Sequence, residues 1–181
     1  MNHRFPRGLS LAALLAVCLP AVADTLPGEK TLQCSVNEGV VAHTLTLILR
    51  QGELIAFDYE SLNKRNGHDC GFDGAITGER EAAAKRRGQL PWETLPGGSI
   101  RIVYGKDQFG DLPEVPLKVL ITPLKNGYRL SYTDNSMWEH CGTRGYLAPT
   151  VTLIKGQPRC RVADKSPGAD AWVDAPAEVR P

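Results

Sequence analysis

Two short segments of the chain carry nearly the same set of reactive residue types. The first is His68-Asp69-Cys70-Gly71, and the second is Glu139-His140-Cys141-Gly142. Each sets an acid and a histidine directly before a Cys-Gly pair, and each follows a stretch that predicts a β-hairpin. In an exported protein, cysteines at such places form disulfides, which would hold the neighbouring acid and histidine in fixed positions. We therefore expect function at these two loops.

The histidines and acids of the two loops admit more than one kind of chemistry. Two histidines with two carboxylates form a set that zinc or another divalent ion accepts, although no His-Glu-x-x-His or similar spacing is present. Carboxylates can also act as acid and base, whereas no Gly-x-Ser-x-Gly elbow supplies a nucleophile. Recognition by contact fits the residue types best, so we expect no catalytic residue, no metal and no cofactor.

The neighbours of the two motifs favour protein binding. Interfaces are enriched in tryptophan and arginine, and a disulfide at the base of a loop lowers the entropy lost on binding. The first loop is polar and basic, which suits an acidic cleft, and the second loop holds a Met-Trp pair with no strand face to join. The predicted contact residues are Lys64, Arg65, His68, Asp69, Met137, Trp138, Glu139 and His140.

The segment Gly67-His68-Asp69-Cys70-Gly71 resembles the protruding His-Asp-Cys-Gly loop of a family of periplasmic lysozyme inhibitors. In that family the histidine enters the lysozyme cleft between the catalytic carboxylates. The resemblance therefore implies that His68 acts as a cationic or donating tip among acids. It covers these five residues, and Arg65 stands where the family has the partner cysteine of Cys70.

The N-terminus predicts export. Arg4 and Arg7 precede an apolar stretch at 9–19, and Ala21-Val22-Ala23 has the small-x-small pattern of a cleavage site. We expect residues 1–23 to be a secretory signal peptide, whose apolar stretch is too short to span a bilayer. The mature protein is expected in the periplasm or outside the cell, with no transmembrane segment.

Size and charge narrow the class of partner. Cleavage leaves 158 residues, which suits one domain, with 19 basic and 20 acidic residues and a formal charge of −1. Nucleic-acid binding requires a clear basic excess, so we expect no nucleic-acid partner. The expected partner is a protein of the cell envelope, and the sequence leaves the oligomeric state open.

Four cysteines remain after cleavage: Cys34, Cys70, Cys141 and Cys160. An even number in an oxidising compartment predicts two disulfides, and three pairings are possible. The sequential pairing, Cys34 with Cys70 and Cys141 with Cys160, is favoured because each bond would close a local unit.

The elements that must position these residues are mainly strands. Apolar residues alternate in several short segments between Gly- and Pro-bearing turns, which predicts an all-β, mainly antiparallel small sandwich or barrel of about seven to eight strands. One short surface helix is expected at 79–88, where acids come first and bases last. The domain is expected to span 24–162, with a possible weak internal duplication between 30–78 and 100–155 and a flexible tail at 163–181.

The sequence thus favours an exported, disulfide-stabilised binding protein that acts by protein–protein contact. The specific function that we expect from this contact is inhibition of lysozyme or another secreted hydrolase, or immunity against a toxin. Two alternatives stay open. One is a metal-dependent or carboxylate-based envelope enzyme that uses His68, His140 and the nearby acids, and the other is a structural envelope protein.

Overall fold

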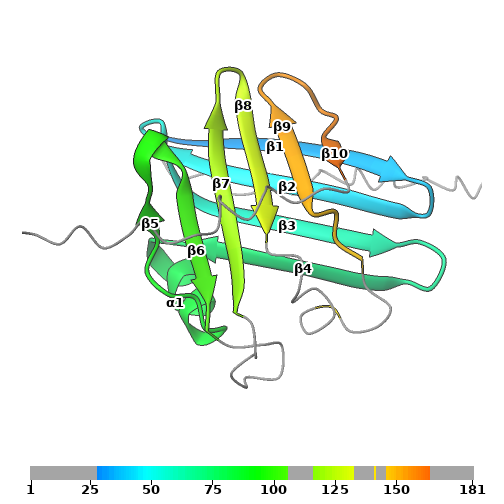
Figure 1. The fold of residues 1–181 in the computed structure, drawn as a ribbon, viewed down its shortest axis with the longest axis horizontal. Coiled ribbons are helices and arrows are strands. Elements are labelled where there is room, and N and C mark those ends of the chain that lie inside the picture. Colours follow the sequence, from blue (N-terminus) through cyan, green and yellow to red (C-terminus); the bar gives the residue numbers. More distant parts are fainter. Residues whose placement is uncertain (1–27, 106–115, 133–140, 142–145, 164–181) are drawn as a thin grey trace, which may run out of the picture.

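The fold consists of two antiparallel sheets that pack face to face (Figure 1). The computed structural model describes residues 28–105, 116–132, 141 and 146–163. One sheet has the order β1-β2-β3-β4 and the other β10-β9-β8-β7-β6-β5. Strands of the two sheets cross steeply in Figure 1, as in orthogonally packed sandwiches. The predicted all-β fold with two disulfides is confirmed as a sandwich rather than a closed barrel.

The described elements are β1 (Glu29–Glu38), β2 (Val41–Arg50), β3 (Glu53–Asn63), β4 (His68–Ala75), α1 (Gly78–Arg86), β5 (Glu93–Thr94), η1 (Pro96–Gly98), β6 (Ile100–Tyr104), β7 (Leu117–Leu124), β8 (Gly127–Tyr132), β9 (Thr150–Ile154) and β10 (Arg161–Ala163). These ten strands exceed the expected seven to eight, because the short β5 and β10 and the strand β4 were not expected. Each sheet is built almost entirely from hairpins between consecutive strands, as the Gly-bearing turns predicted.

The strand β4 corrects the interpretation of the first Cys-Gly motif as a loop. Cys70 and Phe72 face the core while Asp69 and Gly71 are exposed, so the segment alternates like any half-buried strand. Its glycines and aspartates are depleted in strands, and this composition hid the alternation. His68 and Asp69 therefore sit on a hydrogen-bonded strand paired with β3.

The core lies between the sheets and is bridged by aromatic rings. The Phe72 ring meets the Tyr59 and Tyr132 rings edge to face, with centroids 5.5 Å apart in both cases. Such pairs are worth about 0.5–1.5 kcal/mol beyond the area that they bury. Because Phe72 belongs to β4 and Tyr132 to β8, this contact fixes the edge of the first sheet against the middle of the second.

The predicted surface helix is confirmed as α1, which lies beside the end of β4 (Figure 1). Glu81 and Lys85 form the expected i,i+4 ion pair, and Ala84 is the only fully covered side chain among the helix residues. Within the described residues no helix is long and apolar enough to cross a membrane.

The disulfides join the two sheets, so the predicted sequential pairing is wrong. Cys34 is bonded to Cys160 and Cys70 to Cys141, across sequence separations of 126 and 71 residues. The first bond forms because the segment before β10 runs along the edge of β1. There the Ser35 N–H donates to the Pro158 carbonyl at 2.8 Å.

Other expectations fall outside the described residues. The expected signal peptide at 1–23 lies outside them, as does the expected tail except for Ala163, which belongs to β10. The two halves of the possible duplication correspond to different sheets, and duplication stays a prediction.

Candidate functional site

The turn between β3 and β4, together with the first residues of β4, carries the first predicted contact residues. We call residues 63–69 the hairpin tip. Its backbone is closed by the Gly67 N–H, which donates to the Asn63 carbonyl at 2.8 Å, and Gly67 adopts a φ of 69° that favours glycine. The Asn63 Oδ1 accepts from the Arg65 N–H, and the Asn66 Oδ1 accepts from the His68 N–H, both at 3.0 Å. These side-chain bonds hold the turn in one shape.

Lys64 and Arg65 lie at the end of the molecule and are exposed. The Lys64 N–H donates to the Val40 carbonyl at 2.9 Å, and its Nζ donates to the Asn37 Oδ1 at 2.8 Å. Val40 and Asn37 belong to the β1–β2 hairpin, so two neighbouring turns are bonded side by side. The Lys64 ammonium is therefore held near the rim while it stays in solvent.

His68 is half-buried, and its ring is fixed by Cys141, which lies in the connection between β8 and β9. Its Nε2 lies 3.1 Å from the Cys141 carbonyl oxygen, and because a carbonyl can only accept, Nε2 must carry the donated proton. Two positions along the strand, Cys70 is bonded covalently to Cys141. The ring is thus anchored through Nε2, and Nδ1 remains as the nitrogen that can meet a partner.

The Cys70–Cys141 bond also brings the two Cys-Gly motifs together. Met137, Trp138, Glu139 and His140 themselves lie outside the described residues, although the chain continues from them directly into Cys141. Their predicted contact role stays a prediction. The described residues hold no group of three or more His, Cys, Asp or Glu side chains placed to bind a metal ion.

A buried polar pair lies behind the hairpin tip, which the sequence did not indicate. His43 is fully buried, with its Nδ1 3.0 Å from the Tyr59 hydroxyl, and the Ala148 N–H donates to that same hydroxyl at 2.9 Å. The Tyr59 hydroxyl is thus hydrogen-bonded to the His43 ring and to the Ala148 backbone at once. Burial lowers the pKa of His43 and raises that of Tyr59, so both groups are neutral.

Further along the same hairpin, the outer face of the first sheet is acidic. Asp58 and Asp73 are direct cross-strand partners, and Glu60 lies two positions from Asp58 on the same face. Desolvation, together with the charges of Glu60 and Asp73, raises the pKa of Asp58 to about 6 against an opposing effect of Arg80 and Arg87. The alternation of β3 places these acids on one face, but their pairing with Asp73 required knowledge of β4.

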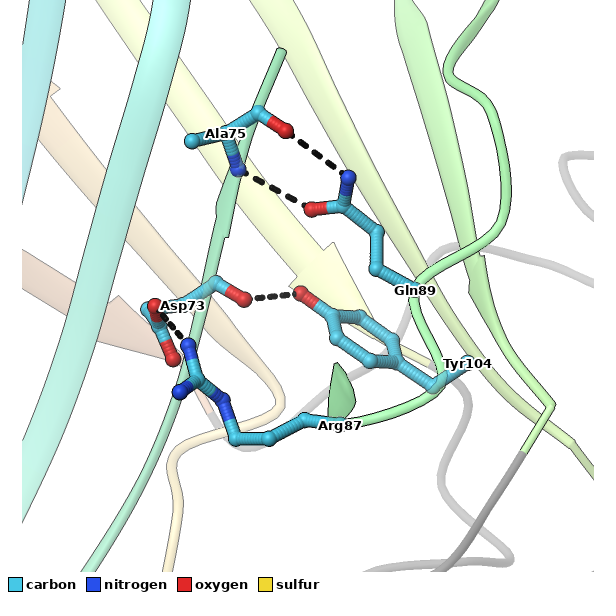
Figure 2. Close-up of polar contacts among 5 residues, drawn as sticks. All are labelled: Asp73, Ala75, Arg87, Gln89 and Tyr104. Atoms are coloured by element: carbon cyan, nitrogen blue, oxygen red, sulfur yellow. Dashed lines mark hydrogen bonds and ion pairs between the residues drawn. The ribbon is translucent and has the colours of Figure 1, made fainter. Parts of the chain in front are cut away.

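The far end of the hairpin is attached to the second sheet by a polar clasp (Figure 2). The Gln89 side-chain amide accepts from the Ala75 N–H at 2.9 Å and donates to the Ala75 carbonyl at 2.8 Å. The Tyr104 hydroxyl donates to the Asp73 carbonyl, and Arg87 forms an ion pair with the Asp73 carboxylate. Together these side chains occupy hydrogen-bonding groups on the outer edge of β4, which would otherwise be unpaired.

Comparisons of the chain with protein-family models, with curated proteins and with solved structures found no significant match.

Proposed function

We propose that this chain is an exported, disulfide-stabilised binding protein that contacts another protein through the hairpin tip. The observation that carries the proposal is the fixation of His68, whose ring donates to the Cys141 carbonyl beside the Cys70–Cys141 bond. The specific form of this binding function is inhibition of lysozyme or of another secreted hydrolase. Immunity against a toxin would use the same kind of contact.

The rigidity of the tip supports this function energetically. Ordering a flexible side chain at an interface costs about 0.5–1.5 kcal/mol. At the hairpin tip, Lys64 is already bonded to the neighbouring turn, and His68 is already held by the Cys141 carbonyl. A partner that binds here therefore avoids part of that cost.

The charge of the tip supports an acidic partner. Lys64 and Arg65 are adjacent and exposed at the rim, beside His68. Complementary charges speed association and suppress wrong partners more than they raise affinity. Hydrolases that cleave glycosidic bonds carry paired carboxylates in an open cleft, which offers the matching charge.

A lysozyme-inhibition assay on the mature chain tests the specific form. We expect inhibition by the wild type and a loss of affinity of roughly tenfold or more in His68→Ala and in Lys64→Glu, as for residues at the centre of an interface. Lys125→Glu is the matched control, because Lys125 is an exposed lysine in the β7–β8 turn of the other sheet. Absence of inhibition by the wild type would show that lysozyme is not the target.

Site-specific photocrosslinking in cells tests protein binding at the tip in general. A photoreactive residue at position 65 should form a discrete adduct with an envelope protein, whereas the same residue at position 125 should not. Equal adducts from both positions, or none from position 65, would contradict binding through the hairpin tip.

A further inference from the structure

A cavity of about 560 Å³ opens at the end of the sandwich opposite the hairpin tip. Leu54 at the start of β3 helps to line it, and Asn63 in the tip is nine residue steps further along the same strand. At about 3.3 Å per residue the two places are about 30 Å apart. The cavity is therefore independent of the contact surface proposed above, and its volume falls within the range of small-molecule sites.

The walls of the cavity come from both sheets and from the connection between α1 and β5. Leu54 and Ile121 supply a buried apolar floor from opposite sheets, and Ile76 stands at the rim with 41% of its surface exposed. Trp92 forms a further wall, and its ring is held by Phe57 with centroids 6.1 Å apart. The cavity is thus a formed apolar space with an aromatic wall.

Polar side chains at two places around the cavity already have partners. The Gln89 amide is bonded at both ends to Ala75, and Glu81 is paired with Lys85 at the rim. The Trp92 Nε1 is buried and meets no partner in the described part of the chain, so the indole presents apolar atoms to the cavity. Polar groups of a bound molecule would lose their hydrogen bonds to water here and gain few from the cavity wall, which disfavours strongly polar molecules.

Charge at the mouth disfavours anions. Among the lining residues, Glu53 and Glu81 are acidic and Lys85 is basic, which leaves one net negative charge. We infer that the cavity binds a neutral, apolar small molecule, with its body between Leu54, Ile121 and the Trp92 ring. This activity goes beyond the proposed contact function and does not depend on it.

Fluorescence titration with Nile red, a neutral apolar dye, tests the inference on the mature protein. We expect saturable binding at one site, with quenching of tryptophan emission that is lost in Trp92→Phe. Ile76→Glu, which places a carboxylate at the rim, should weaken binding by roughly tenfold or more, in line with the cost of burying a charge. Leu62→Glu is the matched control, because Leu62 is 43% exposed near the hairpin tip, and it should bind like the wild type.

A second variant keeps the test independent of folding defects. Glu53 is exposed, so Glu53→Lys should fold normally. It should raise the affinity for the anionic dye 1-anilinonaphthalene-8-sulfonate by roughly two- to fivefold, the size of an exposed charge effect. No saturable Nile red binding to the wild type, or equal losses in Ile76→Glu and Leu62→Glu, would overturn the inference.

Discussion

Replacing Gln89 by methionine tests whether the clasp at the far end of the hairpin stabilises the fold. The backbone of Gln89 forms an antiparallel bridge with Tyr104 beside the second sheet, while its side chain reaches Ala75 in the first. Only 6% of the residue is exposed. Methionine has nearly the same length, so Gln89→Met removes both hydrogen bonds with little change in volume.

The expected cost follows from the two groups left behind. A buried backbone group that loses its partner costs about 1–3 kcal/mol, so loss of both bonds to Ala75 gives about 2–6 kcal/mol. Because Gln89 and Ala75 also line the cavity, water can replace part of the lost bonding. We therefore expect a decrease of about 2–3 kcal/mol in the free energy of unfolding, which is a large share of a typical domain's stability.

Urea denaturation followed by circular dichroism measures this loss, with the m-value as a check that the transition stays comparable. Gln33→Met is the matched control, because Gln33 donates one exposed bond to the Thr46 hydroxyl at 3.2 Å. The control should change stability by less than about 0.5 kcal/mol, as surface substitutions usually do. A Gln89→Met variant as stable as the control would refute the clasp as a stabilising contact.

Two further predictions concern pH and the disulfides. Because the pKa of Asp58 is raised in the folded state, folding favours its protonated carboxyl. The contribution of this group to the free energy of unfolding is therefore fully present below the ordinary pKa of 3.8 and is lost as pH rises through the folded-state pKa of about 6. Asp58→Asn should therefore raise the free energy of unfolding at pH 7.5 by about 1 kcal/mol, after allowance for solvent screening. At pH 4 the same substitution should leave the free energy of unfolding unchanged. An equal effect at both pH values would contradict a raised pKa of Asp58. Removing Cys34–Cys160 by double alanine substitution should cost about 5 kcal/mol, and removing Cys70–Cys141 about 4 kcal/mol, on chain-entropy grounds. In the lysozyme assay, only the variant without the Cys70–Cys141 bond should inhibit more weakly. Equal weakening in both variants would show that the Cys70–Cys141 bond has no specific role in holding the hairpin tip.

The strands that the sequence predicted are those whose side chains alternate without interruption. In β2, for example, Leu45 and Leu47 face the core and Thr44 and Thr46 face outward, so the period alone identifies the strand. β4 failed this test because Gly74 occupies an inward position. A Cβ there would lie 2.5 Å from the Phe57 ring and 2.7 Å from the Gln89 Oε1, so the position requires glycine for packing that a single sequence does not reveal.

The disulfide pairing failed for a different reason. Sequence separation favours local bonds, since short loops close at lower entropy cost, but the pairing is decided by which strands meet. Cys160 reaches Cys34 only because the segment before β10 lies against β1, and Cys141 reaches Cys70 only because the chain returns to β4. Neither approach leaves a local pattern in the sequence.

The exposed turn position of Lys64 and Arg65 was predictable because turn chemistry is local. Asn63, Asn66 and Gly67 specify a tight polar turn, and the basic residues within it could only be exposed. The cavity was not predictable, because each lining residue looks like an ordinary core residue of its own element. Trp92 was the one available signal, since a large aromatic residue directly after Pro91 and outside the alternating segments has no strand face to join.

The β3–β4 hairpin connects both candidate sites because it is attached, near each end, to a segment that adjoins the second sheet. Near the tip the attachment is covalent, through Cys70–Cys141, and at the far end it is the amide clasp of Gln89 on Ala75. An edge strand held at only one end could twist away from the partner sheet and expose its unpaired groups. Two attachments remove that freedom, so the orientation of His68 at one end and the shape of the cavity at the other are set by the same strand. The clasp therefore shapes the cavity directly, whereas it affects the hairpin tip only through the overall stability of the fold. Gln89→Met should accordingly reduce Nile red binding under conditions in which inhibition through the hairpin tip is unchanged.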